Sequence, residues 1–283
     1  MTHDSRIPPR KASLPMSTGS ACNFASDYEI GQSPVMLEIE QRVRGSAYGA
    51  TSWTTRAQAE TAAARLGLAT GRRLLELGGG AGWPALFLAT VSGCEVVVTD
   101  LPLSGLRIAR ARAVCDGLDN RCSVLAADGA ALPFADRTFD RIHHADVLCC
   151  MERKRDMLRE CRRVGRDGAA MEFSVIALAR EARGEEEQQL LAKSGPPYPD
   201  AGADYAVLLL ENGWNVLERF DATAEFASCM DVLLEEYHAR RDALLDLLGE
   251  ENYADRLERR LSTRAAVSRG LLKREIFFSS YRQ

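Results

Sequence analysis

The sequence lacks the features that direct a protein to an oxidising compartment. None of its eight cysteines forms a C-x-x-C pair, and most of them lie in apolar patterns where a free thiol packs as a small hydrophobic side chain. The first residues are polar and contain proline, without the apolar core segment of a secretory signal. These absences predict a reduced, cytoplasmic protein, and we expect no metal ligand set.

Long hydrophobic runs and an excess of positive charge are also missing. The longest uncharged run, Leu77–Cys94, has four glycines in its first six residues and then Pro84, which disfavours a membrane-spanning helix. The net charge is -4, and the basic stretches 153–166 and 256–274 are mixed with acids, as on solvated helix faces. We therefore expect no membrane and no nucleic acid among the partners.

Apolar strand patterns and helical patterns alternate through the middle of the chain. Strands are expected at 73–77, 95–100, 122–126, 139–144 and 168–176, with helices at 84–91, 104–115 and 153–164. Continuous apolar strands separated by helices indicate an α/β fold, in which a parallel sheet is covered on both faces.

The flanking regions are less regular. Residues 1–33 mix proline, serine, threonine and charge without periodicity, which predicts a flexible tail. Residues 34–283 are expected to form a single domain, with a helical cap at 34–70 and inserted helical regions at 179–212 and 222–270. Within these regions we expect short elements at 205–211 and 215–220, two long helices at 222–248 and 251–269, and a final strand at 272–281. Residues 193–199 contain three prolines and cannot continue a regular element.

The glycine-rich segment after the first strand carries the most specific signal. From residue 76 it reads ELGGGAGWP, so a buried strand ends in an acid and a burst of glycines leads into a helix. Glycines permit a tight turn and let the backbone approach a ligand at the helix N-terminus. The dinucleotide fingerprint G-x-G-x-x-G needs a glycine where this chain has Trp83. The spacing found instead is Glu76-x-Gly78-x-Gly80-x-Gly82.

At these residues the chain resembles the class I S-adenosylmethionine-dependent methyltransferases, whose first motif is an acid followed by G-x-G-x-G. The resemblance covers about residues 45–283. Within this class the chain is similar to the small-molecule methyltransferases. It implies a doubly wound, mostly parallel seven-stranded sheet with an antiparallel last strand, a Rossmann-like fold with helical cap insertions. It also implies S-adenosylmethionine as cofactor, S-adenosylhomocysteine as product, and in-line transfer of a methyl group to a small molecule. The acceptor atom would be an amine, hydroxyl or carbon, and a natural-product intermediate is one option.

The resemblance further implies a set of cofactor-binding residues, most of them at strand ends. Glu76 and the glycines that follow would hold the methionine part, and Asp100 would accept hydrogen bonds from the ribose hydroxyls. Asp128 would meet the adenine amino group, and Tyr48 would close over the cofactor carboxylate. The full expected set is Tyr48, Thr55, Glu76, Gly78, Gly79, Gly80, Asp100, Leu101, Asp128, Gly129, His144 and Ala145.

Structural roles compete with several of these assignments. The glycine turn can join strand to helix without a ligand, and Asp100 can cap the helix that follows Pro102. Asp128 and Gly129 can form an ordinary Asp-Gly turn, and Thr54 or Thr55 can cap a helix. Each alternative stays open from the sequence alone.

The segment 143–150 follows the fourth strand, where the family contacts the reacting methyl. Asp146 is predicted to orient the acceptor or to accept its proton, and His144 is the second catalytic candidate. Packing of one imidazole in the core is the alternative for the histidine pair. Cys149 and Cys150 would suggest arsenic or redox chemistry, but no second cysteine pair supports it, and buried packing is favoured.

Three other functions compete with small-molecule methyl transfer. A nicotinamide-dependent oxidoreductase is disfavoured by Trp83 and by the Asp128-Gly129 pair. A non-catalytic protein that binds S-adenosylmethionine would keep the same motifs, because they report binding rather than turnover. Methylation of a macromolecule is disfavoured by the acidic charge balance.

Overall fold

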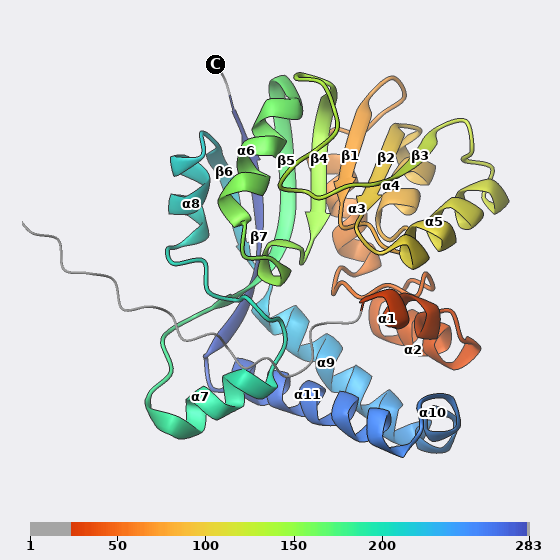
Figure 1. Ribbon diagram of the computed structural model, residues 1–283, viewed down its shortest axis with the longest axis vertical. Coiled ribbons are helices and arrows are strands. Elements are labelled where there is room, and N and C mark those ends of the chain that lie inside the picture. Colours follow the sequence, from red (N-terminus) through yellow and green to blue (C-terminus); the bar gives the residue numbers. More distant parts are fainter. Residues whose placement is uncertain (1–23, 282–283) are drawn as a thin grey trace, which may run out of the picture.

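A computed structural model describes residues 24–281 of the chain. Seven strands form one sheet in the order β3-β2-β1-β4-β5-β7-β6 (Figure 1). The strands are β1 (Arg73–Leu77), β2 (Glu95–Asp100), β3 (Cys122–Ala126), β4 (Phe139–Ala145), β5 (Gly165–Leu178), β6 (Asn215–Asp221) and β7 (Leu272–Ser280). Only β7 runs antiparallel to its neighbours, β5 and β6. The predicted doubly wound, mostly parallel seven-stranded sheet is confirmed.

Helices cover both faces of the sheet because consecutive strand residues point to opposite sides. Leu74 of β1 packs in one hydrophobic cluster with α3 (Arg56–Arg65), α4 (Ala85–Ser92) and α5 (Leu103–Cys115). Leu75 packs in the other cluster with α6 (Lys154–Val164) and α8 (Tyr205–Glu211). β1 is therefore buried on both faces, as its mainly apolar sequence predicts.

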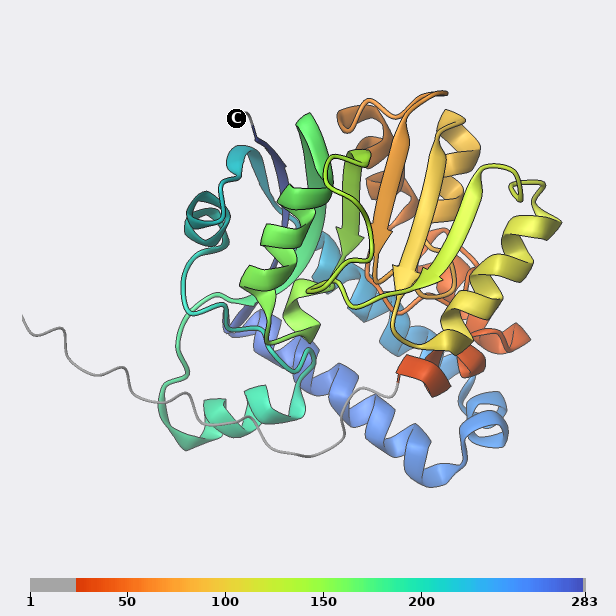
Figure 2. The ribbon, with the colours of Figure 1, turned by 45° about the horizontal axis from the view of Figure 1, so that its top comes forward.

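A further group of helices lies beyond the carboxyl ends of the parallel strands (Figure 2). These helices are α1 (Phe24–Gly31), α2 (Pro34–Arg44), α7 (Gly184–Lys193), α9 (Thr223–Ala239), α10 (Arg241–Leu248) and α11 (Glu250–Ser268). In parallel sheets ligands bind at the carboxyl ends of the strands, so these helices lie where they can enclose a ligand. Within residues 24–281 no helix has both the length and the apolar character needed to span a membrane.

Two local predictions are wrong. Residues 24–31 form helix α1 rather than a flexible tail, because tertiary contacts hold them: the Tyr28 ring is buried and Asp27 pairs with Arg256. The rest of the predicted tail, residues 1–23, lies outside the described residues. The helix expected at 222–248 is divided into α9 and α10 at Arg240, whose backbone leaves the helical region. α7 lies in the inserted helical region expected at 179–212: three glutamates in its first turn favour its N-terminus, and Leu191 anchors it in the core.

Candidate active site

One cavity of about 810 Å³ lies between the strand ends and the helices beyond them. Its first part, called here the strand-end half, is lined by Leu77, Gly78, Thr99, Asp100, Leu101, Ala127, Asp128, Gly129 and Ala145. Its second part, the helical half, is lined by Ile39, Glu40, Val43, Arg44, Trp53, Ile176, Leu233, Tyr237, Asp255, Arg256, Arg259 and Arg260. Asp146 also lines the cavity.

Asp100 is the last residue of β2, and its carboxylate accepts hydrogen bonds from three donors. Its Oδ2 accepts hydrogen bonds from the Gly80 backbone N–H and from the Tyr28 hydroxyl, each at 2.9 Å. Its Oδ1 accepts one from the Leu101 N–H at 2.7 Å, which leaves that oxygen with capacity for another donor. Burial raises the pKa of Asp100, and these donors oppose that rise.

Asp128 and Gly129 lie on the opposite side of the strand-end half, after β3. The Asp128 carboxylate accepts from the Ala130 N–H at 2.9 Å and pairs with Arg153 at 3.2 Å. The turn-forming role of Asp128 is therefore present in the structure, while the residue also lines the cavity. The side chain of Leu101 is 65% exposed nearby and offers an apolar surface.

The three consecutive glycines occupy different surroundings. Gly78 lines the cavity in the left-handed region (φ 63°), and a Cβ there would come within 2.5 Å of a Val147 methyl carbon. A Cβ on Gly80 (φ 47°) would lie 2.4 Å from the Tyr28 ring. Gly79 and Gly80 are not among the cavity-lining residues, so Gly78 alone of the three lies where it can meet a ligand.

The side chain of Glu76 does not reach the cavity. It is buried and lies 2.8 Å from Nδ1 of His143, its register partner on β4. Burial lowers the pKa of His143, but the carboxylate of Glu76 more than compensates, and the net pKa is raised above its ordinary value. The Glu76 side chain thus joins β1 to β4 through His143, and its expected contact with the cofactor through backbone or water stays a prediction.

His144 is also misplaced by the sequence prediction. Its ring is fully buried and stacks on Phe173 with centroids 4.6 Å apart, and neither ring nitrogen has a hydrogen-bond partner. Burial, with the nearby His143, lowers the pKa of His144 well below its ordinary value. An imidazole in this position cannot take a proton from a molecule in the cavity, so both its catalytic role and its cofactor contact are wrong. Its neighbour Ala145 does line the cavity.

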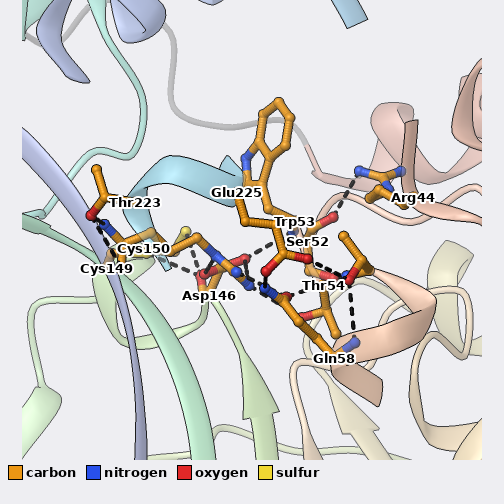
Figure 3. A network of polar contacts seen from close by, with 12 residues as sticks. Arg44, Ser52, Trp53, Thr54, Gln58, Asp146, Cys149, Cys150, Thr223 and Glu225 are labelled. Atoms are coloured by element: carbon orange, nitrogen blue, oxygen red, sulfur yellow. Dashed lines mark hydrogen bonds and ion pairs between the residues drawn. The ribbon is translucent and has the colours of Figure 1, made fainter. Parts of the chain in front are cut away.

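Asp146 belongs to a buried polar network that joins three parts of the chain (Figure 3). Its Oδ1 accepts from Arg274 Nε at 3.0 Å, and its Oδ2 accepts from Arg274 Nη2 at 3.1 Å and the Trp53 backbone N–H at 2.9 Å. Arg274 is fully buried on β7 and also donates to Thr54 and Gln58. Three hydrogen-bond donors, two of them from the Arg274 guanidinium, occupy the carboxylate, which disfavours its role as a proton acceptor. The third donor, the Trp53 N–H, joins Asp146 to a residue that lines the cavity.

Tyr48 and Thr55 lie outside the cavity lining. The Tyr48 ring packs on Trp83 with centroids 5.1 Å apart and lies beneath the guanidinium of Arg112. Thr55 caps α3 in a capping box with Gln58, the structural alternative that the sequence left open. This placement disfavours their expected closure over the cofactor, which stays a prediction.

Two groups of cavity residues were missed by sequence reasoning. Tyr28 covers Gly80 and contacts Asp100, which lies 72 positions away, and no local signal marks it. The arginines of the helical half were interpreted as a solvated helix face. Their spacing on α11, at positions 256, 259 and 260, places them on one side of the helix and was the available signal.

Comparison with known proteins identifies the family of this chain. Residues 75–173 match the family model described as "Methyltransferase domain". The methyltransferase GfsG of Streptomyces halstedii is 30% identical over 196 residues, which cover 67% of this chain and 68% of that protein. The chain belongs to the class I S-adenosylmethionine-dependent methyltransferases. S-adenosylmethionine is therefore its cofactor.

Solved structures agree with this methyltransferase in fold. Haemonchus contortus phosphoethanolamine N-methyltransferase 2, in complex with phosphomonomethylethanolamine and S-adenosylhomocysteine, has a TM-score of 0.75 at 16% identity, covering 93% of this chain and 61% of that one. The [4+2]-cyclase SpnF has a TM-score of 0.73 at 20% identity, covering 93% of this chain and 96% of that one. At these identities the likeness concerns the fold alone. The second neighbour is named a cyclase, so the fold does not specify methyl transfer.

The strand-end half of the methyltransferase fits the cofactor. The Asp100 carboxylate retains capacity for a hydroxyl donor, and exposed Leu101 offers a surface for a flat ring. Gly78 provides a cavity wall without a side chain. Gly78 follows β1, and Asp100 and Leu101 lie at the end of β2, the neighbouring strand. The strand order reverses between β1 and β4, and open parallel sheets bind ligands near such a point.

Proposed function

We propose that the methyltransferase transfers a methyl group to a small molecule bound in the helical half of the cavity, by in-line displacement. One observation carries the proposal: the strand-end half and the helical half belong to the same cavity, so two ligands can meet inside it. S-adenosylmethionine, when bound, supplies a methyl group already activated by its sulfonium. The acceptor atom is an amine, a hydroxyl or a carbon, and a natural-product intermediate is among the candidate acceptors.

The proposed cofactor-binding residues are those that line the strand-end half. Asp100 holds hydroxyl groups, Leu101 packs beside the adenine, and Asp128 with Gly129 forms the opposite wall. Gly78 and Ala145 lie at the ends of β1 and β4, close to the helical half. Tyr28 joins this set as a cover, because its hydroxyl is bonded to the same Asp100 oxygen as Gly80.

The chain's contribution to the reaction is chiefly alignment. Asp146 is held by Arg274 and holds the backbone of Trp53, which lines the helical half. Correct placement of reacting groups contributes up to about 7–11 kcal/mol in favourable cases. Because Asp146 is paired and His144 is buried away from the cavity, the proposal assigns no side-chain base to either residue.

Calorimetric titration of the full chain with S-adenosylmethionine, S-adenosylhomocysteine and NADP tests the cofactor side of this proposal. We expect binding of the two sulfur compounds and none of the dinucleotide. Release of S-adenosylhomocysteine is then followed across a panel of amines, phenols, alcohols and carbon acids small enough for the cavity. A folded sample that binds neither sulfur compound would refute the proposal. Binding without turnover across the whole panel would favour the non-catalytic alternative.

A further inference from the structure

The helical half presents two guanidinium groups that have no acidic partner. Arg256, Arg259 and Arg260 line the cavity from one side of α11. Arg256 pairs with Asp27, which also lines the cavity. Within residues 24–281, no carboxylate lies within 4.0 Å of a nitrogen of Arg259 or Arg260.

The lack of a partner is specific to the central pair on this helix. Arg264, one turn beyond Arg260, forms a two-pronged bridge to Asp231 at 2.6 and 2.9 Å. The arginine on each side of the central pair is therefore neutralised. Asp255, the remaining lining acid of α11, is exposed and forms no ion pair among the described residues.

The side chain of Arg260 is partly buried, so its charge has lost part of its hydration. Its guanidinium carbon is 5.5 Å from the centroid of the Trp53 ring, and its Nε is buried without a hydrogen-bond partner. The ring contact offsets part of the lost hydration. A partly buried cation that lacks an anion attracts one, because water screens it less than it screens an exposed charge.

A second guanidinium, that of Arg44, lies near Arg260 and forms an ion pair with Glu40. Arg44 donates to the carbonyls of Ser52 and Ala50 at 2.7 and 2.8 Å, while its Nε is buried and unpaired. Burial lowers the pKa of Arg44; Glu40 opposes that effect and the nearby Arg260 adds to it. Glu40, 3.7 Å away, is itself occupied by the hydroxyl of Ser46 and by backbone N–H groups.

The rest of the helical half is apolar. Ile39, Val43, Leu233 and the aromatic rings of Trp53 and Tyr237 line it. A ligand that satisfies both surfaces has an apolar body and one anionic end.

Resting on the proposed function, we propose that the methyl acceptor is an organic acid whose carboxylate or phosphate group is held by Arg259 and Arg260. Its apolar body packs against Trp53, Leu233 and Tyr237, and this placement directs the nucleophilic atom towards the strand-end half. Guanidinium groups suit this role because they offer several fixed donors to carboxylate or phosphate oxygens.

Competent probes are phenylacetate and phenyl phosphate, with 2-phenylethanol and 2-phenylethylamine as neutral and cationic counterparts. Each is titrated into the full chain saturated with S-adenosylhomocysteine. We expect at least one anionic probe to bind about tenfold or more tightly than the neutral one, and the cationic probe to bind least. The ratio between the two anions distinguishes a carboxylate site from a phosphate site.

Arg259→Gln and Arg260→Gln are expected to reduce the preference for the anion by about tenfold each, while Arg264→Gln, on the same helix but paired outside the cavity, retains it. Thermal unfolding and S-adenosylhomocysteine affinity establish that each variant is folded. Equal binding of neutral and anionic probes, no binding of either anion at millimolar concentration, or a preference that survives in the double variant would overturn the inference. If S-adenosylhomocysteine itself fails to bind the wild-type chain, the proposed function fails first.

Discussion

The two halves of the cavity are built in different ways. The lining of the strand-end half comes from residues 77–145, each at or just after the end of a parallel strand. The lining of the helical half comes from α2, the segment before α3, β5, α9 and α11, and so from residues as far apart in the chain as Ile39 and Arg260. A parallel sheet fixes where its strands end, so sequence order alone brings the first set together. The second set meets only when separate helices pack.

The halves differ in charge as well. The strand-end half presents the carboxylates of Asp100 and Asp128, whereas the helical half presents Arg259 and Arg260, for which residues 24–281 supply no ion-pair partner. One cavity therefore offers opposite charges to its two ends. This division suits two ligands of unlike chemistry more than one ligand that spans the whole space.

The largest expected effect comes from breaking the contact between the halves. Asp146→Asn leaves the buried Arg274 without its counter-charge and weakens the bond to the Trp53 backbone. Removing one partner of a buried pair typically costs about 3–5 kcal/mol, which we expect as the loss in unfolding free energy measured with urea. Glu225→Gln is the matched control, because Glu225 contacts Thr55 and Gln58 at the exposed end of the network. It is expected to cost about 1 kcal/mol or less. Similar losses in unfolding free energy for the two variants would contradict the role of Asp146 in joining the two halves.

A smaller effect is expected within the strand-end half. Asp100→Asn removes the charged acceptor proposed for the cofactor hydroxyls, so the Kd for S-adenosylhomocysteine should rise about tenfold to a hundredfold. In Tyr28→Phe the ring still covers Gly80, but the hydroxyl that donates to Asp100 is lost. We expect the affinity of this variant for S-adenosylhomocysteine not to fall. Titration calorimetry measures both. Unchanged affinity in Asp100→Asn would remove this residue from the cofactor site, and probe binding in the helical half should be unaltered in either variant.

The smallest effect concerns the two adjacent histidines, whose surroundings shift their pKa values in opposite directions. The pKa of His143 is raised, so its contribution to stability is complete below its ordinary value of 6.5 and is lost as the pH rises through the raised pKa. The pKa of His144 is lowered, so its neutral form is favourable above 6.5 and its contribution is lost as the pH falls below that value.

Urea unfolding across pH 5 to 8 compares wild type with His143→Gln and His144→Phe. The advantage of wild type over His143→Gln should shrink as pH rises, and its advantage over His144→Phe should shrink as pH falls. The sign of each slope is the test. Parallel slopes for the two variants would show that the histidines share one environment.

Sequence reasoning succeeded where the periodicity of strands was enough. It predicted the order of strands and helices, the antiparallel last strand and the positions of Asp100, Leu101, Asp128, Gly129 and Ala145 at the cavity. It failed where the orientation of one side chain mattered. Neighbouring strand residues point in opposite directions, so His144 is buried against Phe173 although Ala145 beside it lines the cavity.

The tyrosine assignment failed for a different reason. Tyr48 has a fitting position ahead of the core, but Trp83 and Arg112 hold it elsewhere, and Tyr28 covers the glycine turn instead. The choice between two tyrosines depends on how α1 packs, and α1 lies in a segment without apolar periodicity.

The sequence by itself determined the family, the sheet and the residues of the strand-end half, because glycine spacing and strand-end acids act through short-range geometry. The tertiary structure decided which acids are free and which are paired. Glu76 and Asp146 look alike as candidates in the sequence, yet each is held by a partner, His143 and Arg274, that the chain supplies from a different strand. It also decided that Arg259 and Arg260 face a cavity rather than solvent, since only the packing of α11 across the strand ends gives those charges an enclosed surface.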